Sequence, residues 1–161
     1  MRFIYFTKTL KELKPLELVE FCKETGVDGL DLAVRPGYPI DPANAVAELP
    51  KFAAIMKQNN LSIPLVSAPT SLVDAESKEA RSLFEACANS GVPMVKIGYF
   101  TYKGNFGEDL QAARKKLEGF LKLAKETKVK AVYHTHSGAN IGNNAASLKE
   151  LLKDFDPHHI G

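Results

Sequence analysis

Short apolar runs alternate with longer amphipathic runs along the whole chain, and this alternation restricts the folds that the chain can adopt. Such a pattern is typical of β-α units built around a parallel sheet. It predicts strands at residues 3–6, 29–34, 62–67, 94–98 and 130–134. It predicts helices at residues 15–25, 43–59, 75–90, 108–128 and 145–154.

The strand-like runs recur about every 25 to 35 residues, which is the spacing of one β-α unit. No linker or change of composition divides the chain, so we expect one domain over residues 1–161. A flavodoxin-like, doubly wound sheet would be complete with five strands. A TIM barrel of about 250 residues would instead be cut off after five of its eight β/α units, with its C-terminal part missing. A sixth strand would then begin near residues 158–161.

The composition excludes several classes of protein. A formal net charge of +2 indicates neither a nucleic-acid nor a membrane partner. The lysines of the run 108–128 are interleaved with glutamates, which is typical of a solvent-facing helix surface. Cys22 and Cys87 fall among apolar residues and should be buried free thiols. Without a signal peptide or an apolar run of about 18 residues, the expected location is cytoplasmic.

Polar residues gather where each predicted strand ends. In either fold these ends lie along one edge of the sheet, where binding sites form. The residues are Thr7, Asp31, Arg35, Ser67, Thr70, Lys96, Tyr99, His134 and His136. The chain has no GxGxxG or GxxxxGK(S/T) loop, so it gives no support for a nucleotide site.

His134 and His136 lie at and just beyond the end of the predicted strand 130–134. Residues two apart on a strand point the same way, so both imidazoles should converge on one small volume. Because imidazole titrates near neutral pH and commonly binds metals, the pair suggests proton transfer or metal binding. We expect His136 to move a proton and His134 to bind a metal or the substrate. Alternatively, one is a hydrogen-bonded core residue and the other is solvated.

Lys96 interrupts the apolar strand 94–98, where a buried ammonium needs a partner, so it is a second catalytic candidate. It could instead point outward and keep its charged end in water. Arg35 could bind a phosphate or several hydroxyls through its planar guanidinium, or could simply pair with Asp31 or Asp41. The other candidates for substrate binding are Thr70, Tyr99 and Tyr102. The two tyrosines could wall a sugar or belong to the core.

Three motifs carry a family resemblance. They are Asp28-Gly29-Leu30-Asp31-Leu32 with Arg35-Pro36-Gly37, Gly98-Tyr99-Phe100-Thr101-Tyr102, and Tyr133-His134-Thr135-His136-Ser137-Gly138. Together they resemble the xylose isomerase-like TIM-barrel superfamily and, within it, the sugar phosphate isomerases and epimerases. The third motif also resembles inosose dehydratases and hydroxypyruvate isomerases of the same superfamily.

The resemblance implies a divalent metal ion, Mn²⁺, Mg²⁺ or Zn²⁺, that stabilises an enediolate while protein groups move a proton. In the family, acidic and histidine ligands from strands five to eight hold this ion. His134 stands where many members have a metal-binding glutamate, and the later strands are absent. Five units cannot close a barrel, so the sheet edges at strands one and five would be exposed unless another copy of the chain covers them.

The residues and the resemblance together predict an isomerase or epimerase that acts on a sugar or sugar phosphate by proton transfer next to a carbonyl. A lyase of the keto-inositol dehydratase type is the nearest alternative, because β-elimination begins with the same proton removal. From a different class, the chain could be a catalytically silent fragment or a binding module that keeps the fold.

Overall fold

The computed structural model describes residues 1–161 and has a parallel five-stranded sheet at its centre. The strands are β1 (Ile4–Phe6), β2 (Gly29–Ala33), β3 (Ser62–Ser67), β4 (Met94–Lys96) and β5 (Lys130–Val132). Their order in the sheet is β1-β2-β3-β4-β5, and each neighbouring pair is parallel. This sequential order is that of a barrel wall and rules out the alternative flavodoxin-like sheet, in which the strand order is permuted.

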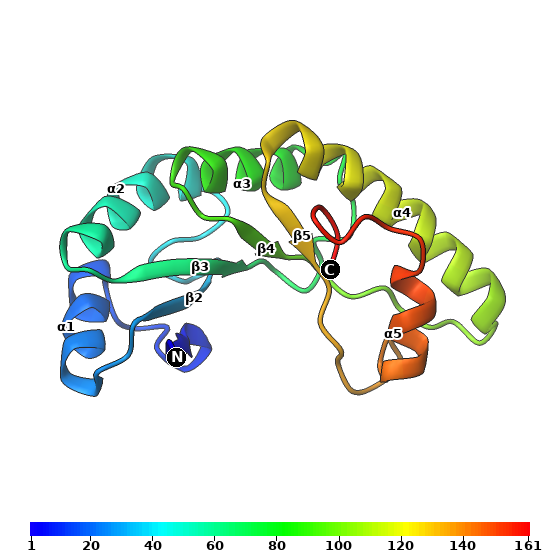
Figure 1. Cartoon of the computed structure of the whole chain (residues 1–161), viewed down its shortest axis with the longest axis horizontal. Helices are drawn as coiled ribbons and strands as arrows, with labels where there is room; N and C mark the ends of the chain where they lie inside the picture. Colours follow the sequence, from blue (N-terminus) through cyan, green and yellow to red (C-terminus); the bar gives the residue numbers. More distant parts are fainter.

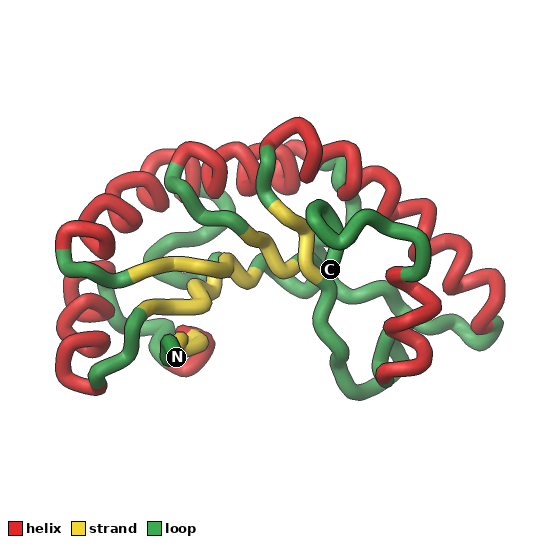
Figure 2. Tube along the Cα trace, in the orientation of Figure 1, coloured by secondary structure: helices red, strands yellow, loops and turns green.

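Five helices follow the five strands in turn. They are α1 (Pro15–Thr25), α2 (Ala45–Gln58), α3 (Lys78–Asn89), α4 (Phe106–Thr127) and α5 (Ala145–Leu152), with a short 3-10 helix at Thr7–Thr9. The sheet is open and curved, and α1 to α4 cover its convex side (Figure 1). The tube view shows the strands on the inner, concave side of this arc (Figure 2).

The hydrophobic core lies mainly between the sheet and the helices. Phe52 of α2, Phe84 of α3 and Phe120 of α4 are each at most 1% exposed. Cys22 and Cys87 are buried free thiols, as predicted. Helix α4 buries Ala113, Leu117 and Phe120, and its lysines face solvent, as predicted. No helix is both long enough and apolar enough to cross a bilayer.

Capping residues explain why two helices do not start where the periodicity predicts. The Ser77 side chain accepts a hydrogen bond from the Ala80 N–H, so α3 begins at Lys78, three residues after the predicted start. Asn105 accepts one from the Glu108 N–H, so α4 begins two residues early, at Phe106.

Strands β4 and β5 end earlier than predicted because the backbone after each strand hydrogen-bonds to residues outside the five strands. After Lys96, the Gly98 N–H donates to the Leu72 carbonyl, 2.7 Å away, instead of to a strand. The predicted sixth strand has its start here, because Ile160 pairs in parallel with Ala131. The outer edge of β5 is therefore partly covered, contrary to expectation, whereas β1 pairs only with β2.

Candidate functional site

A cavity of about 170 Å³ lies at the carboxyl ends of the strands, and each of the five strands or its following loop contributes to it. The lining residues are Phe6, Lys8, Asp31, Arg35, Ser67, Thr70, Lys96, Tyr99, His134 and His136. Larger hollows lie elsewhere, for example one of about 470 Å³ between α1 and α2. The strand-end cavity is distinguished by its chemistry rather than by its size.

Three buried side-chain polar atoms of the chain have no hydrogen-bond partner, and their residues all line this cavity. They are Asp31 Oδ1, Arg35 Nε and Lys96 Nζ. An unpaired buried polar group costs about 1–3 kcal/mol, so folded proteins seldom keep one without a use. Three such atoms in one cavity indicate a site whose hydrogen-bond partners come from a ligand.

Lys96 points into the protein and not outward, so the alternative of a solvated lysine is wrong. The residue is 2% exposed, and its Nζ lies 3.6 Å from the centroid of the Tyr99 ring. Burial, and to a lesser extent nearby Arg35, lowers the pKa of Lys96 from 10.5 to about 8, while Asp31 acts in the opposite direction. A sizeable fraction of this amine is therefore neutral near physiological pH.

Asp31 and Arg35 face the same cavity without forming an ion pair. Arg35 lies over the ring of Phe6 with its guanidinium carbon 5.6 Å from the centroid. It pairs with neither Asp31 nor Asp41, so the proposed structural pairing of Arg35 is absent. Burial raises the pKa of the Asp31 carboxyl, although the neighbouring Ser67, Arg35 and Lys96 oppose this shift.

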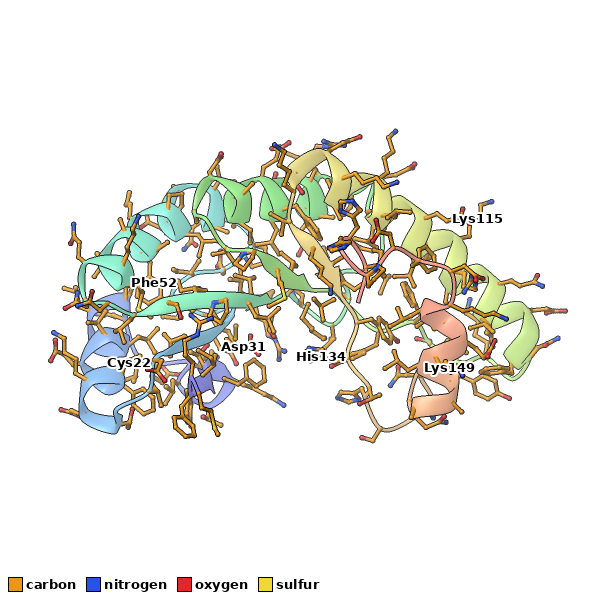
Figure 3. All side chains as sticks on the ribbon, viewed as in Figure 1. Cys22, Asp31, Phe52, Lys115, His134 and Lys149 are labelled. Carbon is orange, nitrogen blue, oxygen red and sulfur yellow. The ribbon has the colours of Figure 1, made fainter.

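Both histidines line the cavity, but not for the predicted reason. Strand β5 ends at Val132, so His134 and His136 lie in the following loop. His136 Nδ1 is 2.8 Å from the Ser137 carbonyl oxygen, and its ring centroid is 4.5 Å from that of Tyr99. Burial lowers the pKa of His134, and the charge of Lys96 lowers it further. Figure 3 labels His134 and Asp31, both on the concave side of the sheet, while Phe52 lies on the helix side.

Tyr102 does not line this cavity. It borders a separate hollow of about 180 Å³ together with Phe106 and residues of the loop before α5. Its hydroxyl donates to the Gly104 carbonyl at 3.0 Å, and the residue is 40% exposed. Six of the seven candidate residues from the sequence are therefore brought together, and Tyr102 is the exception.

Four other residues line the cavity: Phe6, Lys8, Asp31 and Ser67. Asp31 and Ser67 were expected at this edge of the sheet but had no predicted role, and Phe6 and Lys8 were not expected there. Asp31 had a detectable signal, because a carboxylate within an apolar strand needs a partner. Lys8 had no such signal, since it is an exposed residue of the turn that follows β1.

Tyr133 joins the two loops that carry Tyr99 and His136. Its hydroxyl donates to the Ile141 carbonyl at 2.6 Å and accepts from the Phe100 N–H at 3.2 Å. The ring stacks on Phe100 with a 5.4 Å separation of centroids. This buried phenol therefore holds the cavity's rim in place from the end of β5.

Gly98 allows a close approach of backbones beside the cavity. A Cβ atom here would lie 2.5 Å from the Thr70 carbonyl oxygen and 2.8 Å from that of Leu72. Only glycine lets the chain after β4 hydrogen-bond to the loop after β3, which carries Thr70 into the site.

The residues present do not make a divalent-metal site. Nowhere do three His, Cys, Asp or Glu side chains come together as metal ligands. Around this cavity the possible donors, Asp31, His134 and His136, are accompanied by the cations Lys8, Arg35 and Lys96. Cations so close to the donors oppose the binding of a further positive ion.

The sequence matches the xylose isomerase-like TIM-barrel family over residues 19–161. No curated protein sequence matches significantly. Several solved structures share the fold at low sequence identity.

A D-tagatose 3-epimerase-like protein has a TM-score of 0.75 and 19% identity, with 100% of this chain and 63% of that chain covered. The 3-keto-D-glucoside 4-epimerase YcjR from E. coli has a TM-score of 0.76 and 15% identity, with 99% of this chain and 66% of that chain covered. The IolI protein, solved with a bound zinc atom, has a TM-score of 0.74 and 18% identity, with 100% and 61% covered.

The chain thus spans about 61–66% of the length of these three proteins. The family match covers most of the sequence, and the sheet has the sequential strand order of a barrel wall. The chain belongs to the xylose isomerase-like TIM-barrel family.

Proposed function

We propose that the strand-end cavity binds a sugar or sugar phosphate and moves a proton at the carbon next to its carbonyl, as an isomerase or epimerase does. The observation that carries this proposal is the convergence of Asp31 Oδ1, Arg35 Nε and Lys96 Nζ without partners. A sugar offers closely spaced oxygens that can both donate and accept hydrogen bonds, which is what one carboxylate and two cations require.

His136 is the proposed base. A carbonyl oxygen only accepts hydrogen bonds, so the contact with Ser137 places the imidazole proton on Nδ1. In the neutral ring, Nε2 then keeps its lone pair and can remove a C–H proton. The Tyr99 ring beside it limits the orientations of the imidazole.

Lys96 and Arg35 are the proposed groups on the carbonyl side. Removing the proton sends negative charge to the carbonyl oxygen, and nearby cations stabilise this charge. Asp31 accepts a hydrogen bond from a substrate hydroxyl, and Thr70 and Tyr99 border the remaining space. His134, which lines the same cavity, contacts a substrate oxygen.

The family resemblance implies metal assistance, with His134 as one ligand of Mn²⁺, Mg²⁺ or Zn²⁺. The side chains of this chain do not fit such an ion, because no three metal donors converge. We therefore derive no step through a metal. A cytoplasmic location would suit a sugar-metabolising enzyme and remains a prediction.

Hydrogen exchange with solvent tests the proposal. The protein is incubated in D₂O with D-fructose and with D-fructose 6-phosphate, and deuterium at the carbons next to the carbonyl is followed by NMR. We expect incorporation that His136→Gln slows by about 10²–10⁴-fold. Thr135→Ser, a change in the same exposed loop, is the matched control and should leave the rate unaffected.

Binding of either sugar without exchange would contradict the proposed reaction and favour the binding module. The same experiment with keto-inositol addresses the lyase alternative. Loss of water without an epimerised product would identify a dehydratase.

A further inference from the structure

We propose that Lys96 forms a covalent imine with the substrate carbonyl, so that this site activates the carbonyl with its own amine. The inference rests on the proposed function, which supplies a carbonyl substrate. It goes beyond that function because it names a covalent intermediate and restricts the reaction to one type.

The position of Lys96 is the first argument. It is the only lysine among the buried residues of the chain, and it is the last residue of β4, at the cavity. Its Nζ has no hydrogen-bond partner and forms no ion pair. A lysine held only for structure would be paired with a carboxylate, which would keep it protonated and unreactive.

The protonation state of Lys96 is the second argument. Desolvation and a neighbouring cation are the two means by which proteins activate a lysine for imine chemistry, and burial and Arg35 supply both. With a pKa of about 8, roughly one-tenth of this amine is neutral at pH 7. For an ordinary lysine the neutral fraction is roughly one in 3,000, so the difference is about 300-fold.

The covalent step balances without any external oxidant or reductant. The neutral amine attacks the carbonyl carbon, the carbonyl π pair moves to oxygen, and one proton passes from nitrogen to oxygen to give a carbinolamine. The hydroxyl leaves as water with one further proton, which gives an iminium ion. Solvent supplies this proton.

His136 then removes the proton from the neighbouring carbon, the C–H electron pair forms a C=C bond, and the π pair of C=N⁺ moves to nitrogen to give a neutral enamine. A solvent proton adds to the carbon from the opposite face, and addition of water then breaks the C–N bond and releases the amine and an epimerised sugar. The nitrogen stays on the original carbonyl carbon throughout. The imine route therefore permits epimerisation next to a ketone but not transfer of the carbonyl to the next carbon.

Tyr99 covers the amine in this structure, with its ring centroid 3.6 Å from Nζ. The ring is half-buried and lies in the loop after β4, where its backbone N–H bonds to the Thr70 carbonyl. A rotation of this side chain exposes Nζ to the cavity. Truncation of the ring should therefore speed the reaction of Lys96 with small carbonyl compounds.

Reductive trapping tests the proposal. The full chain is incubated at pH 7 with dihydroxyacetone or D-fructose and sodium cyanoborohydride, which reduces an iminium to a stable secondary amine. Peptide mass spectrometry then measures the adduct at every lysine. We expect Lys96 to be modified at least tenfold faster than the median exposed lysine, and still faster in Tyr99→Ala.

Lys96→Arg keeps a positive charge but cannot form an imine, so it should abolish the fast adduct and the exchange with solvent. Lys125→Arg, at an exposed position on α4, is the matched control. If Lys96 reacts no faster than exposed lysines with either ketose, the proposal is overturned, because the wild-type result does not depend on the folding of a variant.

Failures of the two proposals are distinguishable. Exchange without a Lys96 adduct would retain the proton-transfer function and reject the imine. A Lys96 adduct without exchange would retain the imine and reject the proton-transfer function. An aldose formed from D-fructose would also reject the imine route.

Discussion

Replacing Lys96 by methionine should make the folded chain more stable near neutral pH. Methionine keeps the length of the side chain and removes the charge. The pKa of Lys96 falls from 10.5 to about 8 on folding, and each pKa unit corresponds to about 1.4 kcal/mol. The charged lysine therefore costs the folded state about 3 kcal/mol at pH 7. Loss of the contact with the Tyr99 ring offsets about 0.5–2 kcal/mol of the gain.

The pH dependence gives the prediction a definite sign. Below pH 8 the amine is charged in both the folded and the unfolded chain, so the full penalty applies. Between pH 8 and 10.5 the folded chain has lost the proton and the unfolded chain still holds it, so the penalty declines as pH rises. At higher pH both are neutral and the penalty vanishes.

Urea denaturation of wild type and Lys96→Met at pH 7 and pH 9.5 measures the effect. We expect the variant to be more stable by about 1–3 kcal/mol at pH 7, and this advantage to shrink by about 2 kcal/mol at pH 9.5. Titrating groups that do not sense the charge of Lys96 cancel in the difference between the two proteins. Lys125→Met, at an exposed site, should show no such dependence. If the difference in unfolding free energy between wild type and Lys96→Met does not change with pH, Lys96 is not a buried and largely unpaired amine.

Three further substitutions test the surroundings of the site. Gly98→Ala should destabilise the chain by about 1–3 kcal/mol in urea denaturation, because its Cβ meets two carbonyl oxygens, whereas Gly107→Ala, whose Cβ has nothing closer than 3.7 Å, should not. Tyr133→Phe should cost about 1–3 kcal/mol by leaving the Ile141 carbonyl unpaired, and should also weaken ligand binding measured by calorimetry. His136→Gln should lower hydrogen exchange while leaving the urea midpoint unchanged, because its side chain is exposed; a large stability loss would contradict its assignment as a free base.

The helices and strands were predictable because they follow from local periodicity, whereas periodicity left the strand order open between a barrel wall and a flavodoxin-like sheet. Helix α1 has the predicted bounds, and strand β3 does as well. Lys96 and Arg35 were also recognisable, since a charged residue within or just after an apolar strand stands out from its neighbours. The gathering of polar residues at one edge follows directly from a parallel sheet.

Other features depend on contacts between distant segments and could not be predicted. The ends of β4 and β5 are set by hydrogen bonds to the loop after β3 and to residue 161. The absence of a pair between Asp31 and Arg35 depends on where the two side chains point, and sequence spacing does not reveal this. Tyr102 is directed away from the cavity because its backbone N–H bonds to the Ala139 carbonyl in another loop.

Mapping of ligand contacts by NMR determines whether the unpaired charges at the strand ends form one sugar site. Backbone amide shifts are recorded while D-fructose or D-fructose 6-phosphate is added. We predict that the perturbed amides cluster at residues 31–35, 67–70, 96–99 and 134–136 and that Lys96→Met weakens the response. Shifts confined to the larger hollow between α1 and α2, or no shifts at these four segments at saturating sugar, would show that the strand ends do not form a sugar site.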